Sequence, residues 1–107
     1  MFVLPTRADN SPLVALETLA CGTPVVSFDV GGVVELVRPG VTGLLAPPED
    51  AEGLGHALTT LLEYRSKRAA LGEAARTMVL NEFNEALAVE CHVHLYERLL
   101  ERDRAAL

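Results

Sequence analysis

The sequence predicts an α/β fold: a three-stranded parallel sheet with flanking helices, followed by a helical C-terminal half. Short apolar runs at residues 2–5, 24–28 and 42–46 alternate with helical segments. Each run is continuously apolar, as in strands that helices cover on both faces. The strand–helix–strand–helix–strand order implies right-handed crossovers, and therefore parallel strands. Residues 1–48 form this βαβαβ region and residues 49–107 the helical region of a single domain. A helical bundle with an irregular first half is the alternative.

Local signals place the two crossover helices. The first is expected over residues 12–21, with Ser11 as N-cap, Pro12 as first helical residue and Gly22 near the C-cap. The second is expected to open at Gly31 and Gly32 and to run through about residue 37, where Pro39 and Gly40 close it.

Three helices are predicted in the second half. Asp50 can cap the first, Ser66 starts the second, and Asn84 caps the third, which ends in a charged tail at residues 101–104. Apolar residues recur at spacings of three and four along the first two, at Leu54, Ala57, Leu58, Leu61, Leu62, Leu71, Ala74, Ala75 and Met78.

Composition narrows the function classes. With 50% hydrophobic and 22% charged residues, the 107-residue chain is expected to be globular. Its net charge of -6 argues against a surface for nucleic acid or anionic membranes. No apolar run is long enough to span a membrane and no signal peptide opens the sequence, so a cytoplasmic protein is expected.

Cysteine and histidine give weak signals. Cys21 and Cys91 lie in apolar helical segments without ligand-like spacing, and both are expected to be buried, reduced thiols. His92 and His94 are two residues apart, on opposite sides of a helix, and His56 is isolated, so no metal site is expected.

Residues 9–17 carry the chemical information. A strand ends in a polar loop that leads into a capped helix, whose first N–H groups form an anion site at the carboxyl end of the sheet. Two carboxylates flank this point, Asp9 in the loop and Glu17 in the helix, and a carboxylate can accept two hydrogen bonds from a sugar diol. A polar turn capped by Ser11 is the alternative for the loop. Glu17 as a solvated residue fits less well, because the helix around it is almost wholly apolar.

This segment resembles the group 1 glycosyltransferases, retaining enzymes of the GT-B fold. Their signature is an acidic residue, seven intervening residues and Glu, then an Ala-Cys-Gly-Thr-Pro-Val-Val stretch, which Asp9, Glu17 and residues 20–26 match. Residues 31–35, Gly-Gly-Val-Val-Glu, resemble the family's Gly-Gly-x-x-Glu element, and residues 40–45 resemble the loop and strand that follow. The similarity extends over residues 2–48, and implies a partial Rossmann-like domain.

The resemblance implies roles for individual residues. Glu17 matches the residue that binds the nucleotide ribose, and Asp9 the acidic residue that contacts the donor sugar. Backbone amides near Ser11, Leu13 and Val14 match the diphosphate contacts, and Asn10 lies in the same donor-binding loop.

A second set of candidates comprises Gly31, Gly32 and Glu35. For the glycines, tight packing or a positive φ is an equal alternative, and Glu35 can equally be an ordinary exposed helix residue.

Two departures from the family pattern stand out. Asp9 replaces the more common Glu, which shortens its reach by about 1.5 Å, one carbon–carbon bond. Pro12 has no N–H to donate.

Several elements of the family pattern are not found in this sequence. No earlier strands, glycine-rich turn, diphosphate-binding Arg and Lys, or N-terminal acceptor domain precede Met1. We therefore expect binding of a nucleotide-diphosphate sugar without a metal cofactor, and no transfer by the isolated chain. An unpaired sheet edge should favour a homodimer. A non-catalytic fold remnant acting as an interaction module is the alternative.

Overall fold

A parallel sheet forms the centre of the molecule. The structure is a computed structural model that describes residues 1–9 and 12–106. Its three strands are β1 (Phe2–Leu4), β2 (Val25–Phe28) and β3 (Gly43–Ala46), in the order β1–β2–β3. Both pairings are parallel, with Val26 opposite Val3 on one side and opposite Leu44 on the other. The predicted parallel sheet is therefore confirmed, and the helical-bundle alternative is wrong.

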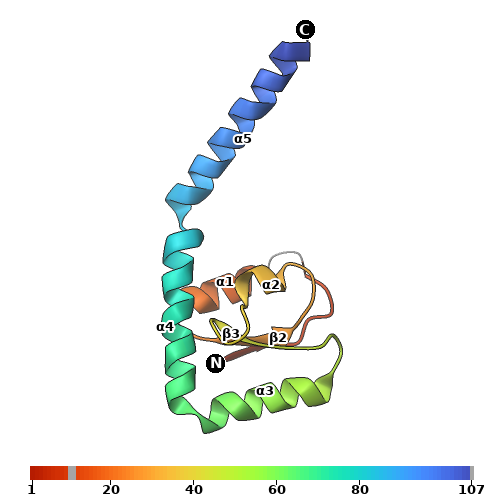
Figure 1. Cartoon of the computed structure of the whole chain (residues 1–107), viewed down its shortest axis with the longest axis vertical. Coiled ribbons are helices and arrows are strands. Elements are labelled where there is room, and N and C mark those ends of the chain that lie inside the picture. Colours follow the sequence, from red (N-terminus) through yellow and green to blue (C-terminus); the bar gives the residue numbers. More distant parts are fainter. Residues whose placement is uncertain (10–11, 107) are drawn as a thin grey trace.

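Helices cover both faces of this sheet (Figure 1). Helices α1 (Leu13–Ala20) and α2 (Val33–Leu36) lie on one face, and α3 (Ala51–Glu63) lies on the other. Helix α4 (Arg65–Glu82) contacts both α1 and α3 and so passes along the side of the layers. Helix α5 (Glu85–Ala106) extends away from the body, which makes the molecule 61 Å long but only 27 and 18 Å across.

The core lies on the two faces of β2, whose residues are all buried. Val25 packs into a cluster with residues of α1, α2 and α4, while Val26 points to the opposite face and packs with residues of α3. Continuous apolar sequence in β2 is explained by this arrangement, because both sets of alternating side chains face a helix.

The start of α1 corrects one prediction. Pro12 is not the first helical residue but the N-cap, with φ −71° and ψ 108°, and its carbonyl accepts from the Leu16 N–H at 3.2 Å. Its fixed φ and missing N–H suit the N-cap as well as the first turn, so the sequence could not separate the two positions. Asn10 and Ser11, including the predicted Ser11 cap, lie outside the described residues. Gly22 follows α1 with φ +76°, as its predicted place near the C-cap requires.

Caps in the helical half agree with the sequence. An Asp50 carboxylate oxygen accepts from the Gly53 N–H at 2.9 Å, and the Asn84 side-chain oxygen accepts from the Leu87 N–H at 2.8 Å. Both predicted caps are confirmed. Helix α4 begins at Arg65, one residue before the predicted start.

Close contact between α4 and the turn after α1 holds the helical half against the sheet. A Cβ added to Gly72 would lie 2.2 Å from the Gly22 carbonyl oxygen, so only glycine allows this approach. The Arg76 guanidinium donates to the Ala20 carbonyl at 2.7 Å, at the C-terminal end of α1.

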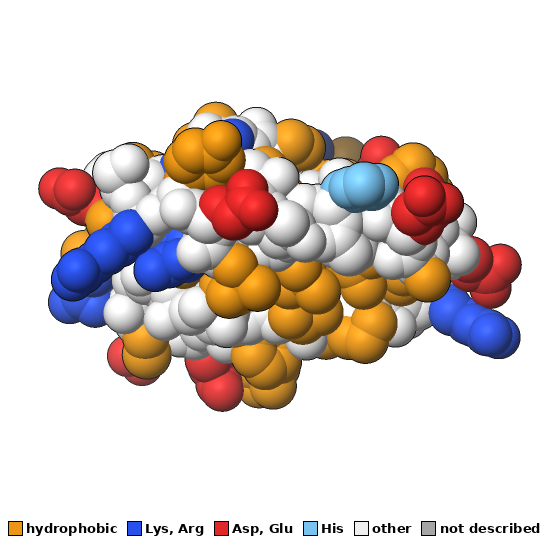
Figure 2. Space-filling view, turned by 90° about the horizontal axis from the view of Figure 1, so that it is seen from below, with side chains coloured by type: hydrophobic (Ala, Val, Ile, Leu, Met, Phe, Trp, Pro, Cys, Tyr) orange, Lys and Arg blue, Asp and Glu red, His pale blue; other side chains and the backbone are white. Residues whose placement is uncertain are grey.

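The surface includes both cysteines. Cys21 and Cys91 are exposed, so the prediction that they are buried is wrong. Cys21 lies at the C-cap of α1, past its packed turns, and Cys91 lies in α5, which has no buried residue. Figure 2 shows the molecule seen from below, with hydrophobic side chains gathered across its middle, an acidic side chain just above them, and Lys and Arg mostly toward the left and right sides. Within the described part of the chain, every helix is too short or too polar to cross a membrane.

We predict that Gly72→Ala lowers the free energy of unfolding by about 1–3 kcal/mol, because the new methyl group overlaps backbone that cannot move freely. Gly55→Ala is the matched control: it also lies inside a helix, but nothing lies within 4 Å of its added Cβ. The control should be neutral or more stable by up to about 1 kcal/mol, from helix propensity alone. Urea unfolding of both variants measures the difference; equal stabilities would contradict the contact.

Candidate donor-binding site

Three loops follow the carboxyl ends of the strands and lie at one edge of the sheet. Their described parts are residues 5–9 and 12 after β1, residues 29–32 after β2 and residues 47–50 after β3. An ion pair of 3.3 Å between Arg7 Nε and a Glu49 carboxylate oxygen joins the first loop to the third. The Asp29 N–H donates to the Ala46 carbonyl at 2.8 Å and joins the second loop to the end of β3. Ligands of open α/β sheets bind at this edge.

The structure brings three of the predicted site residues together: Asp9, Gly31 and Gly32. The Gly32 N–H donates to the Asp9 backbone carbonyl at 2.8 Å, which ties the loop after β1 to the turn after β2. Asp9 is partly buried there. Gly32, which is far from Asp9 in the sequence, therefore fixes the backbone of Asp9, one of the two carboxylate residues of the signature.

Gly31 allows this contact for two reasons. Its φ is +48°, which L side chains rarely adopt. An added Cβ would also lie 2.1 Å from the Asp9 carbonyl oxygen. The turn closes with a 3.1 Å bond from the Val33 N–H to the Val30 carbonyl. Since Gly32 has φ −78° and ψ −2°, positive φ is confined to the first central position, as in a type II′ turn.

Helix α1 presents the second carboxylate. Glu17 is exposed, and it shares its helix face with Leu13 and Val14, which are 66% and 48% exposed. The apolar surroundings predicted for Glu17 are thus at the surface, whereas Ala15 and Leu19 form the buried face. The first N–H groups of the helix, including those of Leu13 and Val14, have no intrahelical partner.

Glu35 is less tightly connected to the site. It is exposed on the short helix α2, next to the turn that holds Asp9. Over residues 1–9 and 12–106, no hydrogen bond or ion pair involves the side chain of Glu17 or Glu35. Both carboxylates are therefore available to a ligand.

Sequence reasoning missed the Arg7–Glu49 pair. Glu49 has φ +59°, an uncommon conformation for a residue other than glycine. Arg7 lies two residues before Asp9, and its basic side chain in the loop after β1 was the one available signal. Its partner follows β3, about forty positions later, and only the parallel sheet brings the two loops together.

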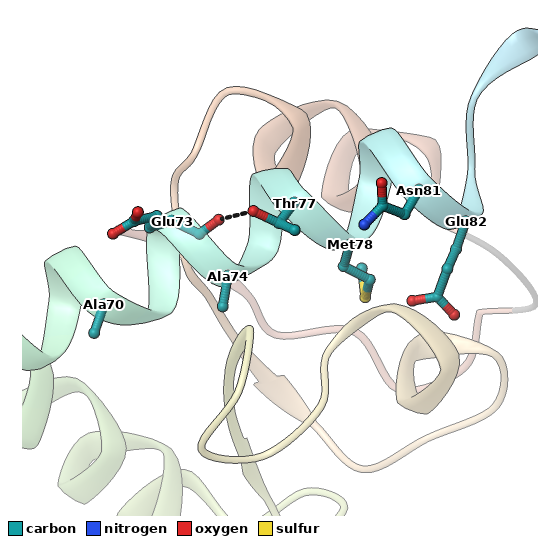
Figure 3. A pocket seen from close by; sticks show the side chains of 7 residues that line it. All are labelled: Ala70, Glu73, Ala74, Thr77, Met78, Asn81 and Glu82. Carbon is teal, nitrogen blue, oxygen red and sulfur yellow. Dashed lines mark hydrogen bonds between the residues drawn. The ribbon is translucent and has the colours of Figure 1, made fainter.

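A groove lies elsewhere, away from these loops. It runs along α4, has a volume of ≈ 470 Å³, and is lined by Ala70, Glu73, Ala74, Thr77, Met78, Asn81 and Glu82 (Figure 3). Glu82 also binds Arg38 through two hydrogen bonds of 2.7 and 2.9 Å. Arg38 precedes β3, so this end of the groove is on the side of the amino ends of the strands. None of the predicted site residues lines it.

No metal centre is evident among the described residues, which contain no cluster of three or more His, Cys, Asp or Glu side chains suited to an ion. The site therefore offers carboxylates, backbone N–H groups and apolar surface.

Comparison with known proteins gives the family. Residues 1–78 match the family described as glycosyl transferases group 1, and the chain belongs to that family. It is 42% identical over 72 residues, or 67% of its length, to the D-inositol 3-phosphate glycosyltransferase of Kribbella flavida. It is 36% identical over 105 residues, or 92% of its length, to the amylovoran biosynthesis glycosyltransferase AmsK of Erwinia amylovora. These matches span 17% and 26% of the two relatives.

Solved structures agree on the fold. Sucrose-phosphate synthase from Thermosynechococcus elongatus is 40% identical with a TM-score of 0.83, over 94% of this chain and 25% of that one. Anabaena HepE in complex with UDP is 27% identical with a TM-score of 0.78, over 92% of this chain and 27% of that one. The described chain is thus a GT-B glycosyltransferase segment about a quarter the length of these structures.

We predict a small acid-dependent loss of stability that depends on Glu82. The Arg38 hydrogen bonds hold the pKa of this carboxyl below its ordinary value. A lowered pKa in the folded state stabilises the protein above the unfolded pKa, and this stabilisation is lost as the pH falls through the folded pKa. Glu82→Gln should remove that part of the pH dependence, as measured by thermal unfolding from neutral to acidic pH. Glu73→Gln, without an ion pair in the described chain, is the control; a profile unchanged by Glu82→Gln would contradict the pairing.

Proposed function

We propose that this chain is the donor-binding part of a glycosyltransferase that transfers a hexosyl group from a nucleotide-diphosphate sugar to an acceptor. One observation carries the proposal: Asp9, the Gly31–Gly32 turn and the start of α1 lie at the carboxyl edge of the sheet, within the segment that matches the family. Family membership indicates the class of reaction, glycosyl transfer. The loops at the carboxyl edge of the sheet offer groups that are chemically suited to the donor.

Each part of a nucleotide sugar has a complementary group. The N-terminal N–H groups of α1 and the positive end of its dipole favour a diphosphate. Glu17 can accept hydrogen bonds from both ribose hydroxyls, and exposed Leu13 and Val14 offer apolar contact beside it. We assign the contact with the sugar to Asp9. The donor loop also contains Asn10 and Ser11.

UDP-sugars are the first donors to test. Structures of the similar protein HepE hold UDP, UDP with glucose, or UDP-glucose, and they are 27–29% identical to this chain. The proposal includes no metal, because carboxylates at the described site are assigned to hydroxyl groups. Donor binding should therefore persist in EDTA.

Transfer requires more than these residues. The chain spans about a quarter or less of the relatives described above. Charge on the leaving diphosphate must be stabilised and water excluded before a glycosyl bond can be exchanged. We assign those tasks, and acceptor binding, to an N-terminal domain or separate polypeptide. Free thiols at Cys21 and Cys91 suit the reducing cytoplasm, where we place the protein.

Glu17→Ala should weaken UDP-glucose binding about ten- to a hundredfold, since a hydrogen bond to a charged group contributes about 1.5–3 kcal/mol. Isothermal titration calorimetry measures the change, with Glu63→Ala as control. Glu63 is also an exposed helical glutamate, but it lies on α3, on the other face of the sheet. Unchanged affinity in Glu17→Ala would refute the ribose role.

A second candidate function, an interaction module, is favoured by α5. None of its residues is buried, and Val89, Val93, Leu95, Tyr96, Leu99 and Leu100 are exposed along it.

The strand β1 offers a different surface for association. The Phe2 N–H donates to the Pro24 carbonyl, on the side of β2. Because successive N–H groups of a strand point to opposite sides, the Val3 N–H points to the free edge of the sheet. We propose a homodimer joined at this edge around a two-fold axis.

Light scattering at tens of micromolar tests the dimer, which a monomer would contradict. Val3→Pro removes the N–H donor at the free edge and should give monomers. Leu99→Glu places a charge on α5 and should leave the dimer intact. The reverse pattern would assign the dimer contact to α5 rather than to β1.

A further inference from the structure

We infer that the Gly31–Gly32 turn is a positioning element for Asp9, and that it sets the affinity for the sugar of the donor rather than for its nucleotide. The inference rests on the proposed function, in which Asp9 contacts the sugar and Glu17 the ribose. It assigns to Gly31 a role in binding that acts through the backbone of another residue.

The contact is between backbone atoms only. The Gly32 N–H holds the Asp9 carbonyl oxygen at 2.8 Å, and Gly31 has no side chain where that oxygen lies. The carbonyl and the carboxylate belong to the same residue. Any change in the position of the Asp9 backbone is therefore transmitted to the carboxylate, whatever side chains surround it.

A methyl group at residue 31 would force such a change. Its carbon would lie 2.1 Å from the Asp9 oxygen, whereas real Cβ contacts essentially never fall under 3.0 Å. One of the two backbones must therefore move by about 1 Å, a displacement that is large for an oriented binding group.

The turn is the more firmly held of the two partners. The Asp29 N–H is bonded to Ala46 in β3, and the Val33 N–H closes the turn on Val30. Val33 and Leu36 anchor the following helix in the core, where they are 0% and 2% exposed. The loop at Asp9 is only partly buried. A collision at residue 31 should thus displace Asp9 rather than the turn.

Glu17 should feel little of this displacement. It lies in α1, whose position is fixed by buried Ala15 and Leu19 and by the bond from Arg76 to the Ala20 carbonyl. The proposed sugar contact therefore depends on the Gly31–Gly32 turn, and the proposed nucleotide contact depends on the packing of α1. A change at residue 31 should separate the affinity for UDP-glucose from that for UDP.

The test compares Gly31→Ala with Gly40→Ala in the full 107-residue chain. Both glycines have positive φ, +48° and +74°, so both substitutions strain the backbone. Only residue 31 has a neighbour within 4 Å of the new methyl group; residue 40 has none. Calorimetry with UDP-glucose and with UDP gives two affinities per variant. Gly31→Ala should weaken UDP-glucose binding about tenfold or more and leave UDP binding within about twofold, while Gly40→Ala changes neither.

A double-mutant cycle with Asp9→Ala distinguishes positioning from general damage. Once the carboxylate is absent, adding Gly31→Ala should cost UDP-glucose affinity little more, because both changes remove the same contact. Additive losses would overturn the positioning role. So would an equal loss of UDP and UDP-glucose affinity in Gly31→Ala, or full UDP-glucose affinity in Gly31→Ala when Asp9→Ala has lost it. Failure of the unaltered chain to bind either ligand would instead refute the proposed function.

If Gly31→Ala does not fold, NMR spectroscopy of the unaltered chain still tests the positioning role. The NMR signal of the Gly32 amide reports on its hydrogen bond to Asp9. We expect UDP-glucose to shift it and UDP alone to leave it in place. Equal shifts with both ligands, or none with UDP-glucose at saturation, would overturn the inference.

Discussion

The central strand β2 is paired along both edges and covered on both faces, and the other elements take their positions from it. Val25 and Val26 point to opposite faces and are each fully buried. Parallel neighbours require crossovers, so helices fill the space above and below the sheet. As a result the carboxyl ends of all three strands meet at one edge, where the loops with Asp9, Gly31 and Glu49 come together.

The opposite edge is braced by α4. Gly72 packs directly on the turn that precedes β2, and Glu82 binds Arg38 before β3. The side-chain bonds described in the loops at the carboxyl edge are local or exposed: the Thr6 hydroxyl donates to the Ala8 carbonyl, Asp50 caps α3, and Arg7 pairs with Glu49. This division also explains why the groove along α4 lies apart from the candidate site. The groove belongs to the bracing side of the sheet.

The candidate site is built mainly from backbone geometry. Its two signature carboxylates come from the loop after β1 and from α1, and they are supported separately, Asp9 by the glycine turn and Glu17 by the packed face of α1. Exposed Leu13 and Val14 beside Glu17 form an open surface rather than an enclosed pocket. A ligand bound there would be covered on one side only. An open half-site of this kind is consistent with a chain that spans about a quarter of its relatives.

Helix α5 differs from the rest of the fold in its energetics. It is long, capped by Asn84 and regular, yet it buries no side chain. Most helices in proteins derive their stability from packing of an apolar face, whereas the large apolar residues of α5 from Val89 onward are exposed in the described structure. Its apolar face is therefore a surface that a partner can cover.

The sequence by itself determined the class of fold, the strand positions and the caps at Asp50 and Asn84, because period, apolar runs and capping residues are local signals. The resemblance to the group 1 family also paired Asp9 with Glu17, because their separation matches the family's signature. Tertiary structure alone decided the support of Asp9 by Gly32, the pairing of Arg7 with Glu49, the exposure of Cys21 and Cys91, and the separation of α5 from the body. These features depend on which residues meet across the sheet or fail to meet. A local pattern does not contain that information, because contact between distant segments is fixed only when the strands pair and the helices pack.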